Sequence, residues 1–165
     1  MSGALQDQVL AVEPSVDGAL AYRPCQVTLV DGSERDFVYL CEAGPWFDFW
    51  GIDPEDDGEK THIDVEDVRA IAESPSRLPA RFANVMYRAG ESRMGGCDFV
   101  LLLRDGRRLS CGTGNAVDFL RWPEDVSPTD IVELIPHAGD LGSDQVQPAP
   151  SARCLYETDE NKRAP

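Results

Sequence analysis

The chain has 165 residues, of which 42% are apolar and 8% aromatic, and it carries a formal net charge of −15. This composition supports a globular core, and the acidic charge argues against nucleic acid and anionic membranes as partners. No apolar run approaches the ~18 residues of a transmembrane helix, and residues 1–7 do not resemble a signal peptide. We therefore expect a cytoplasmic protein, and the excess of arginine over lysine is associated with a GC-rich bacterial genome.

The charge is unevenly distributed along the chain. Residues 1–75 contain 17 acidic and 4 basic residues, a net charge of −13, whereas residues 76–122 contain 4 acidic residues and 8 arginines, a net charge of +4. Residues 123–165 contain 9 acidic and 3 basic residues, a net charge of −6. Net charge governs solubility and the kinetics of association more directly than it governs fold. The acidic first half therefore indicates either solubility alone or a surface that captures a basic protein.

The first strong pattern is a β-hairpin. It follows a weakly patterned N-terminal segment, residues 1–19, and runs from Pro24 to Cys41 within a first β repeat over residues 20–75. A three-residue loop at 31–33 gives the cleanest alternation of apolar and polar residues, which is typical of half-buried strands. In this register one face of the hairpin carries Cys25, Val27, Leu29, Phe37, Tyr39 and Cys41.

An aromatic stretch follows the hairpin. The segment from Trp46 to Trp50 is rich in residues that favour β structure, so we predict a buried strand there. An acidic loop at 53–60 comes next, and the chain then returns as a strand over 61–65 and a short closing element ending at Ile71.

Residues 76–98 connect the two halves of the chain. Two prolines between positions 74 and 80 mark the joint. Residues 80–90 fit an amphipathic helix, with Pro79 at its start and Gly90 at its end, but their apolar residues also alternate as in a strand, and both interpretations are retained. The glycine-rich stretch 90–96 is predicted to be a flexible loop.

A second β repeat covers residues 99–139. A two-residue turn, Asp105–Gly106, would pair Leu102 with Leu109 and Val100 with Cys111. When the stretches 41–50 and 111–120 are aligned end to end, they share Cys, Gly, Asp and Phe at the same four places. The last segment of each half aligns with a smaller offset, position 68 with position 131, because the second half lacks the acidic loop.

These patterns predict a mainly β fold, with α+β as the alternative. Two tandem hairpin-plus-strand copies of small-barrel type would form one compact unit, and residues 140–165 would be a disordered tail. The residues expected to be buried are Cys41, Cys111, Phe49, Phe119, Val68 and Ile131.

The residues that carry catalytic and metal chemistry form no strong motif. The five cysteines include no closely spaced pair, so small buried thiols without a disulfide are expected, and neither a metal nor a cofactor is expected. Cys97 and Cys154, which are flanked by loop or tail, are the two expected to be exposed. Only His62 and His137 could serve as a histidine base. Residues 53–64 place oxygen ligands as a Ca²⁺ loop does, but Glu55, Asp64 and the strand-like flanks depart from that motif, which favours a simple acidic loop.

Three functions remain open at this point. The favoured hypothesis is a non-catalytic acidic module that binds a basic protein, as an inhibitor or immunity protein would. One alternative is a small enzyme or ligand-binding domain that uses the arginine-rich middle segment for an anionic ligand, and another is a regulatory small-barrel domain that binds a peptide. The residues expected to contact the partner are Asp53, Glu55, Asp56, Asp57, Glu59, Asp64, Glu66, Trp46 and Trp50.

Overall fold

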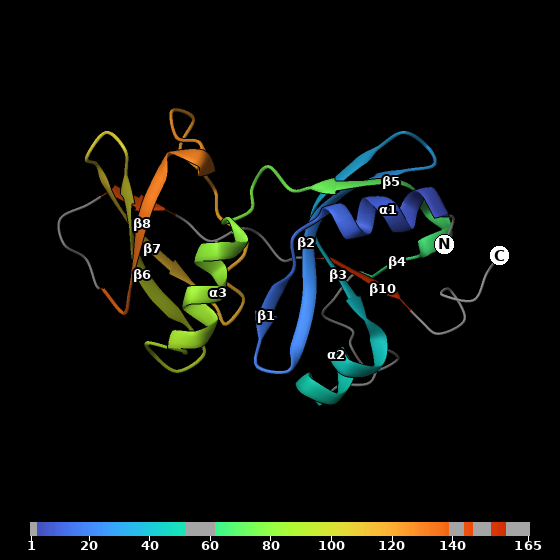
Figure 1. Cartoon of the computed structure of the whole chain (residues 1–165), viewed down its shortest axis with the longest axis horizontal. Helices are drawn as coiled ribbons and strands as arrows, with labels where there is room; N and C mark the ends of the chain where they lie inside the picture. Colours follow the sequence, from blue (N-terminus) through green and yellow to red (C-terminus); the bar gives the residue numbers. More distant parts are fainter. Residues whose placement is uncertain (1–2, 52–61, 139–143, 147–152, 158–165) are drawn as a thin grey trace. The chain divides into compact units, whose positions relative to one another are not determined.

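The structure is a computed structural model, and it describes residues 3–51, 62–138, 144–146 and 153–157. The described residues form a mainly β protein with three α-helices and two sheets, neither of which closes into a barrel (Figure 1). The chain divides into two compact units. Unit 1 comprises residues 1–75 and 150–165, and unit 2 comprises residues 76–149.

Unit 1 is built around the hairpin of β2 and β3. Its sheet has the order β1-β2-β3-β10-β4, with β5 pairing antiparallel with β2, and α1 packs against β5. A core cluster that includes Val9, Val27, Leu40 and Ile71 lies within this unit. Its elements are α1 (Gly3–Ala11), β1 (Ser15–Asp17), β2 (Leu20–Leu29), β3 (Glu34–Glu42), α2 (Ala43–Trp50), β4 (His62–Ile63), η1 (Val65–Asp67), β5 (Val68–Glu73) and β10 (Arg153–Glu157).

Unit 2 is built around the hairpin of β6 and β7. Its sheet has the order β8-β6-β7-β9, and α3 packs against β8. Phe99, Leu101 and Leu109 are among the buried residues of its core. Its elements are α3 (Ala80–Ala89), β6 (Cys97–Leu103), β7 (Arg108–Thr113), η2 (Pro128–Asp130), β8 (Ile131–Pro136) and β9 (Asp144–Val146).

The ambiguous segment 80–90 is a helix. α3 buries Phe82, Ala83 and Met86, which lie on one stripe because residues three and four apart share a helix face. The helix ends at Gly90, whose φ of 77° is readily adopted by glycine. The helical interpretation is therefore confirmed, and the alternation that suggested a strand has no structural counterpart.

Both hairpins lie where the Asp-Gly pairs predict them, but both predicted registers are wrong. In the first, Thr28 pairs with Glu34. In the second, Leu101 pairs with Leu109. In each turn the aspartate accepts a hydrogen bond from the backbone N–H two residues later, and the glycine has a positive φ. In the first hairpin a backbone bond from the N–H of Leu29 to the carbonyl of Ser33 closes a loop of residues 30–32, which is as long as predicted but lies one position earlier. In the second hairpin the bond from Leu103 to Arg107 closes a loop of residues 104–106, one residue longer than predicted.

The aromatic segment before the acidic loop is a helix, contrary to the predicted strand. α2 buries Trp46 and Phe47 and exposes Phe49, as expected for a short helix with one face on the protein. It ends at Gly51 with φ of 67°. Phe49 is 44% exposed, so its predicted burial is wrong. The other five residues predicted to be buried are at most 5% exposed.

The predicted disordered tail contains two strands. β9 pairs in parallel with β7, and β10 pairs in parallel with both β3 and β4. The sequence around these short strands gives little indication of strand structure. Their pairing partners lie far earlier in the chain. Parallel pairing between such distant segments is decided by tertiary structure.

Candidate functional site

The acidic residues predicted to contact a partner fall partly within the described structure. Asp64 and Glu66 lie at the start of η1, and Asp64 is exposed to solvent. The Oδ1 atom of Asp64 lies 3.4 Å from Nε2 of His62. Five further predicted residues lie outside the described residues; they are Asp53, Glu55, Asp56, Asp57 and Glu59.

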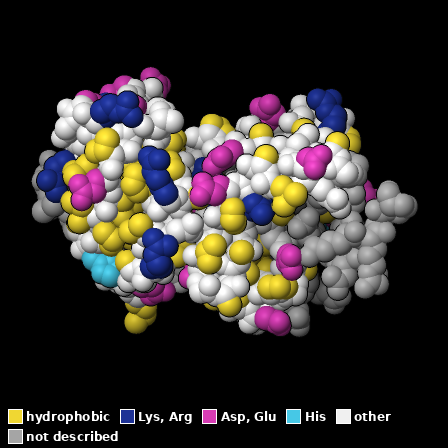
Figure 2. Space-filling view, viewed as in Figure 1, with side chains coloured by type: hydrophobic (Ala, Val, Ile, Leu, Met, Phe, Trp, Pro, Cys, Tyr) yellow, Lys and Arg dark blue, Asp and Glu magenta, His cyan; other side chains and the backbone are white. Residues whose placement is uncertain are grey.

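The acidic charge separates by structural unit. Unit 1 contains 20 acidic and 7 basic residues, a net charge of −13, whereas unit 2 contains 10 acidic and 8 basic residues, a net charge of −2. On the face shown in Figure 2, acidic side chains outnumber basic ones over unit 1, and the two kinds are intermixed over unit 2. Sequence blocks alone do not give this division, because the chain returns to unit 1 at residue 150.

Trp46 is not at the surface. Its ring is 4% exposed and lies 5.5 Å from the ring centroid of Tyr22 and 6.0 Å from that of Tyr39. The two tyrosine rings meet edge to face at 5.2 Å, so the three rings form one buried aromatic cluster. A residue that anchors a partner must be accessible to it. Because Trp46 is buried, it does not meet this requirement. The side chain of Trp50 lies outside the described part of the chain.

Three arginines of the middle segment each contact a neighbouring side chain. Arg93 pairs with Asp98, and Arg107 pairs with Asp105 and with Asp125. The hydrogen bonds that the Arg107 guanidinium donates to both carboxylates raise its pKa. Arg81 lies over the ring of its neighbour Phe82, with Cζ 4.6 Å from the ring centroid. These arginines therefore stabilise their own surroundings, which weakens the hypothesis of a shared anion site.

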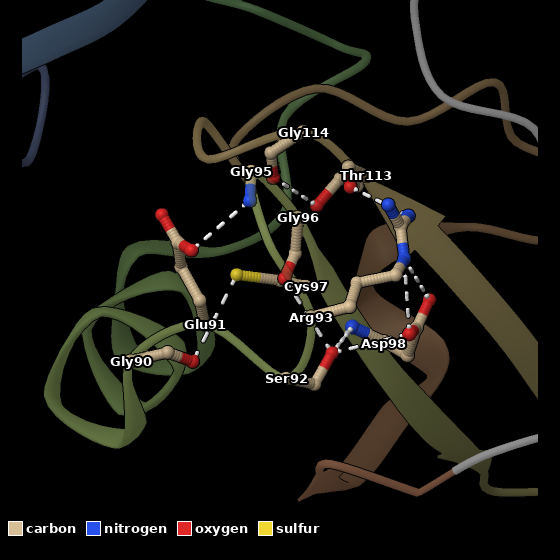
Figure 3. A network of polar contacts seen from close by, with 10 residues as sticks. All are labelled: Gly90, Glu91, Ser92, Arg93, Gly95, Gly96, Cys97, Asp98, Thr113 and Gly114. Atoms are coloured by element: carbon tan, nitrogen blue, oxygen red, sulfur yellow. Dashed lines mark hydrogen bonds and ion pairs between the residues drawn. The ribbon is translucent and has the colours of Figure 1, made fainter.

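The loop between α3 and β6 is fixed by hydrogen bonds (Figure 3). Nε of Arg93 donates to both carboxylate oxygens of Asp98 at 3.2 and 3.1 Å, and its Nη2 donates to the carbonyl of Thr113 at 3.1 Å. A Cβ atom on Gly96 would lie 2.3 Å from Nη1 of Arg93, so only glycine lets the guanidinium pack here. Sequence reasoning missed this network, although the glycines gave a signal for a close approach.

The same loop is closed by two further side chains. The carboxylate of Glu91 accepts from the N–H of Gly95 at 3.0 Å, and Oγ of Ser92 accepts from the N–H of Asp98 at 2.7 Å. The prediction of a flexible loop did not foresee these bonds. In the described residues the hydroxyl of Ser92 contacts the carbonyl of Gly96 and the carboxylate of Asp98.

The described cysteines are buried and none forms a disulfide; they are Cys25, Cys41, Cys97 and Cys111. The predicted exposure of Cys97 is therefore wrong. Burial raises the pKa of the Cys111 thiol to about 12. Burial, together with the negative charge of Glu91, also raises the pKa of Cys97. Because the thiolate is the nucleophile, these two thiols are poorly suited to covalent catalysis at neutral pH.

A hollow of about 410 Å³ opens on unit 1 between α1 and the strands β2 and β3. Its walls are mostly apolar, and Arg23 and Glu42 are its charged residues. The lining residues are Gln6, Val9, Leu10, Pro14, Ala21, Tyr22, Arg23, Leu40, Cys41 and Glu42. No sequence pattern pointed to it, because its walls come from three separate elements.

Two features are absent from the described residues. They contain no group of three or more histidine, cysteine or acidic side chains placed to hold a metal ion. None of their helices has both the length and the apolar character needed to cross a membrane. The calcium hypothesis concerned residues 53–64, most of which lie outside the described ranges.

Comparison with known proteins finds no relative: no protein family, no curated protein and no solved structure matches this chain.

Proposed function

We propose that this chain is a non-catalytic protein-binding module whose acidic unit 1 binds a basic protein, in the manner of an inhibitor or immunity protein. The observation that carries the proposal is the separation of charge, with −13 on unit 1 and −2 on unit 2. Acidic residues that served only solubility would be expected on both units. A concentrated negative field attracts basic surfaces and accelerates their encounter.

The acids around η1 offer a defined part of this field. Asp64, Glu66 and Asp67 lie close together in the sequence, and none of them is buried. In the sequence these acids are flanked by His62 on one side and by Arg69 of β5 on the other. At an ionic strength of 0.1 M such charges act over about 10 Å. Their contribution should therefore be visible at low salt and lost at high salt.

Reversing two of these charges should slow association with the partner. The partner is first captured from the native host and identified, and its association rate is then measured by surface plasmon resonance over a salt series. We expect E66K/D67K to lower the rate about tenfold at low salt, with the difference narrowing as salt rises. The matched control is E124K/E133K, which makes the same charge change on unit 2.

The control variant should stay within about twofold of the unmodified chain, a small change beside the tenfold effect of steering. A partner without a basic surface would overturn the proposed function, as would an association rate that responds equally to both double reversals. Melting curves of both variants establish that the charge changes leave the fold intact.

We also propose that the two units are copies of one supersecondary unit. In each, a hairpin leads through a 3₁₀ helix to a strand that pairs antiparallel with the first strand of the hairpin. In each, a later strand adds in parallel to the second strand of the hairpin. The ladder irregularity also falls at the same place, next to Leu29 in unit 1 and next to Leu103 in unit 2.

The hydrogen bonds around the two turns support this proposal. The N–H of Val30 donates to the carbonyl of Asp67 at 2.8 Å, and the N–H of Arg104 donates to the carbonyl of Asp130 at 2.8 Å. These bonds match Val30 with Arg104 at the turn and Asp67 with Asp130 at the 3₁₀ helix.

If the two units are copies, the ladders favour a different alignment from the one that matches Cys41 with Cys111. Cys25 pairs with Val38, and Phe99 pairs with Cys111. Matching Val30 with Arg104 along the first strand of each hairpin also matches Cys25 with Phe99. Cys111 then corresponds to Val38 and not to Cys41.

Since unit 2 builds the proposed common arrangement at a net charge of −2, that arrangement does not require the acids of unit 1.

Exchanging the turns tests the proposed copy relationship. Replacing residues 30–33 by the sequence of residues 104–107 changes only Val30 and Ser33, both to arginine. We expect the free energy of unfolding to change by no more than about 1 kcal/mol, as surface substitutions usually do. The contrasting variant is Gly32→Ala, which forces a side chain into φ of 85° and should cost more. Urea unfolding checks both, and a turn exchange costlier than G32A would contradict equivalence.

A further inference from the structure

We propose that the hollow of unit 1 is the pocket for a lysine or arginine side chain of the basic partner. This inference rests on the proposed function and names the place where the partner's charge is read. It starts from the shape and chemistry of the hollow, whose apolar walls carry one carboxylate, that of Glu42. A long basic side chain has the matching form, with an apolar stem and a charged end.

The apolar wall includes a residue that folding does not account for. Leu10 lines the hollow but is 71% exposed, whereas its neighbour Val9 is 7% exposed and belongs to the core. Exposed apolar side chains that occur singly are ordinary, but Leu10 stands beside Pro14 and Leu40 at one concave site. The stem of a guest side chain would cover this surface and remove it from water.

Arg23 is the second charged residue of the hollow, and its charge already has a local use. Its Nη1 donates to the carbonyl of Val12, one residue beyond the end of α1. The carboxyl end of a helix carries partial negative charge, and α1 has no basic residue in its last turn. Arg23 therefore serves as the cation for this helix end.

Glu42 is the acidic group at the rim. It is exposed at the end of β3, where the chain turns into α2. The surrounding unit has a net charge of −13, so a cation approaching the hollow is attracted over a distance and an anion is repelled. The preferred guest is thus cationic.

Small probes test the hollow without the partner. The full chain is titrated with N-acetyl-arginine amide, with the neutral analogue N-acetyl-citrulline amide, and with N-acetyl-aspartate amide, and binding is followed by amide shifts in NMR spectra. We expect the arginine probe to move the signals of residues that line the hollow and to bind at least about fivefold more tightly than the citrulline probe. Preference for the citrulline or aspartate probe, or shifts elsewhere only, would overturn the proposal.

Two matched variants locate the binding. Leu10→Lys places a positive charge at the rim, and because Leu10 is largely exposed, the fold should tolerate the change. Val30→Lys makes the same change at a residue that is 61% exposed in the hairpin turn and does not line the hollow. We expect L10K to weaken the arginine probe about fivefold or more and V30K to leave it within about twofold. Equal responses to both variants would overturn the proposal.

The outcomes separate this inference from the proposed function. If E66K/D67K slows association with a basic partner while L10K changes neither probe nor partner binding, the hollow is not the pocket and the binding module stands. If no basic partner exists, the proposed function fails whatever the probes do. Glu42→Gln, compared with Glu34→Gln at the exposed start of the same strand, then shows whether any probe binding depends on the rim carboxylate.

Discussion

Deleting residues 150–165 should destabilise unit 1 and leave unit 2 folded. β10 supplies the strand between β3 and β4, and it pairs with positions 38 to 42 of β3. Without β10, β4 loses its pairing with that strand, and the edge of β3 is opened to water. Each lost backbone hydrogen bond costs about 1 kcal/mol, so losing several removes much of the roughly 5–15 kcal/mol typical of a domain.

Hydrogen exchange measured by mass spectrometry resolves the two units separately. We expect amides of β2 and β3 to lose protection in the truncated chain, while those of β6 and β7 keep it. The control deletes only residues 158–165 and so retains β10. If the two truncations give the same protection in unit 1, β10 contributes nothing to its stability, and the closing role assigned to this strand is wrong.

The second large effect concerns a buried carboxylate in unit 2. Asp118 is fully buried, and the hydroxyl of Tyr87 on α3 donates to its Oδ2 atom. The same hydroxyl accepts from the N–H of Val117 at 3.2 Å, so one oxygen ties the segment before η2 to the helix. We expect Tyr87→Phe to lower the free energy of unfolding by about 1–3 kcal/mol, because the substitution removes a hydrogen-bond donor from a buried acceptor.

A double-mutant cycle separates this bond from the general effects of substitution. Tyr87→Phe, Asp118→Asn and the double variant are compared by urea unfolding. A coupling energy of about 1–2 kcal/mol is expected if the two side chains stabilise each other directly. Additive effects would contradict that coupling and would assign the losses to packing around each residue.

The hollow and the acidic surface differ in how far the sequence could reveal them. The excess of acids in residues 1–75 is visible in the composition, and this segment makes up most of unit 1. The hollow is not visible, because Leu10, Arg23 and Glu42 lie on three elements that meet only in the folded unit. The loop shown in Figure 3 was predictable only in part. Its glycines are evident in the sequence, but the packing of Arg93 against Gly96 is not.

Local chemistry determined what the sequence by itself could reveal. The Asp-Gly pairs located both hairpins because an aspartate side chain and a glycine with positive φ favour a turn from neighbouring residues alone. The pattern of apolar residues also identified Val68, Ile131, Cys41 and Cys111 as buried. A mainly β protein follows from these local signals.

Tertiary structure decided the rest. The aromatic segment forms α2 because Trp46 packs against Tyr22 and Tyr39, whose rings come from two strands, and this packing overrides the strand preference of aromatic residues. The pairing of β10 with β3 joins positions 153–157 to positions 38–42, and no short window of sequence records such a contact. Register, chain closure and the hollow depend on contacts between distant segments, because burial there is shared among elements that fold together.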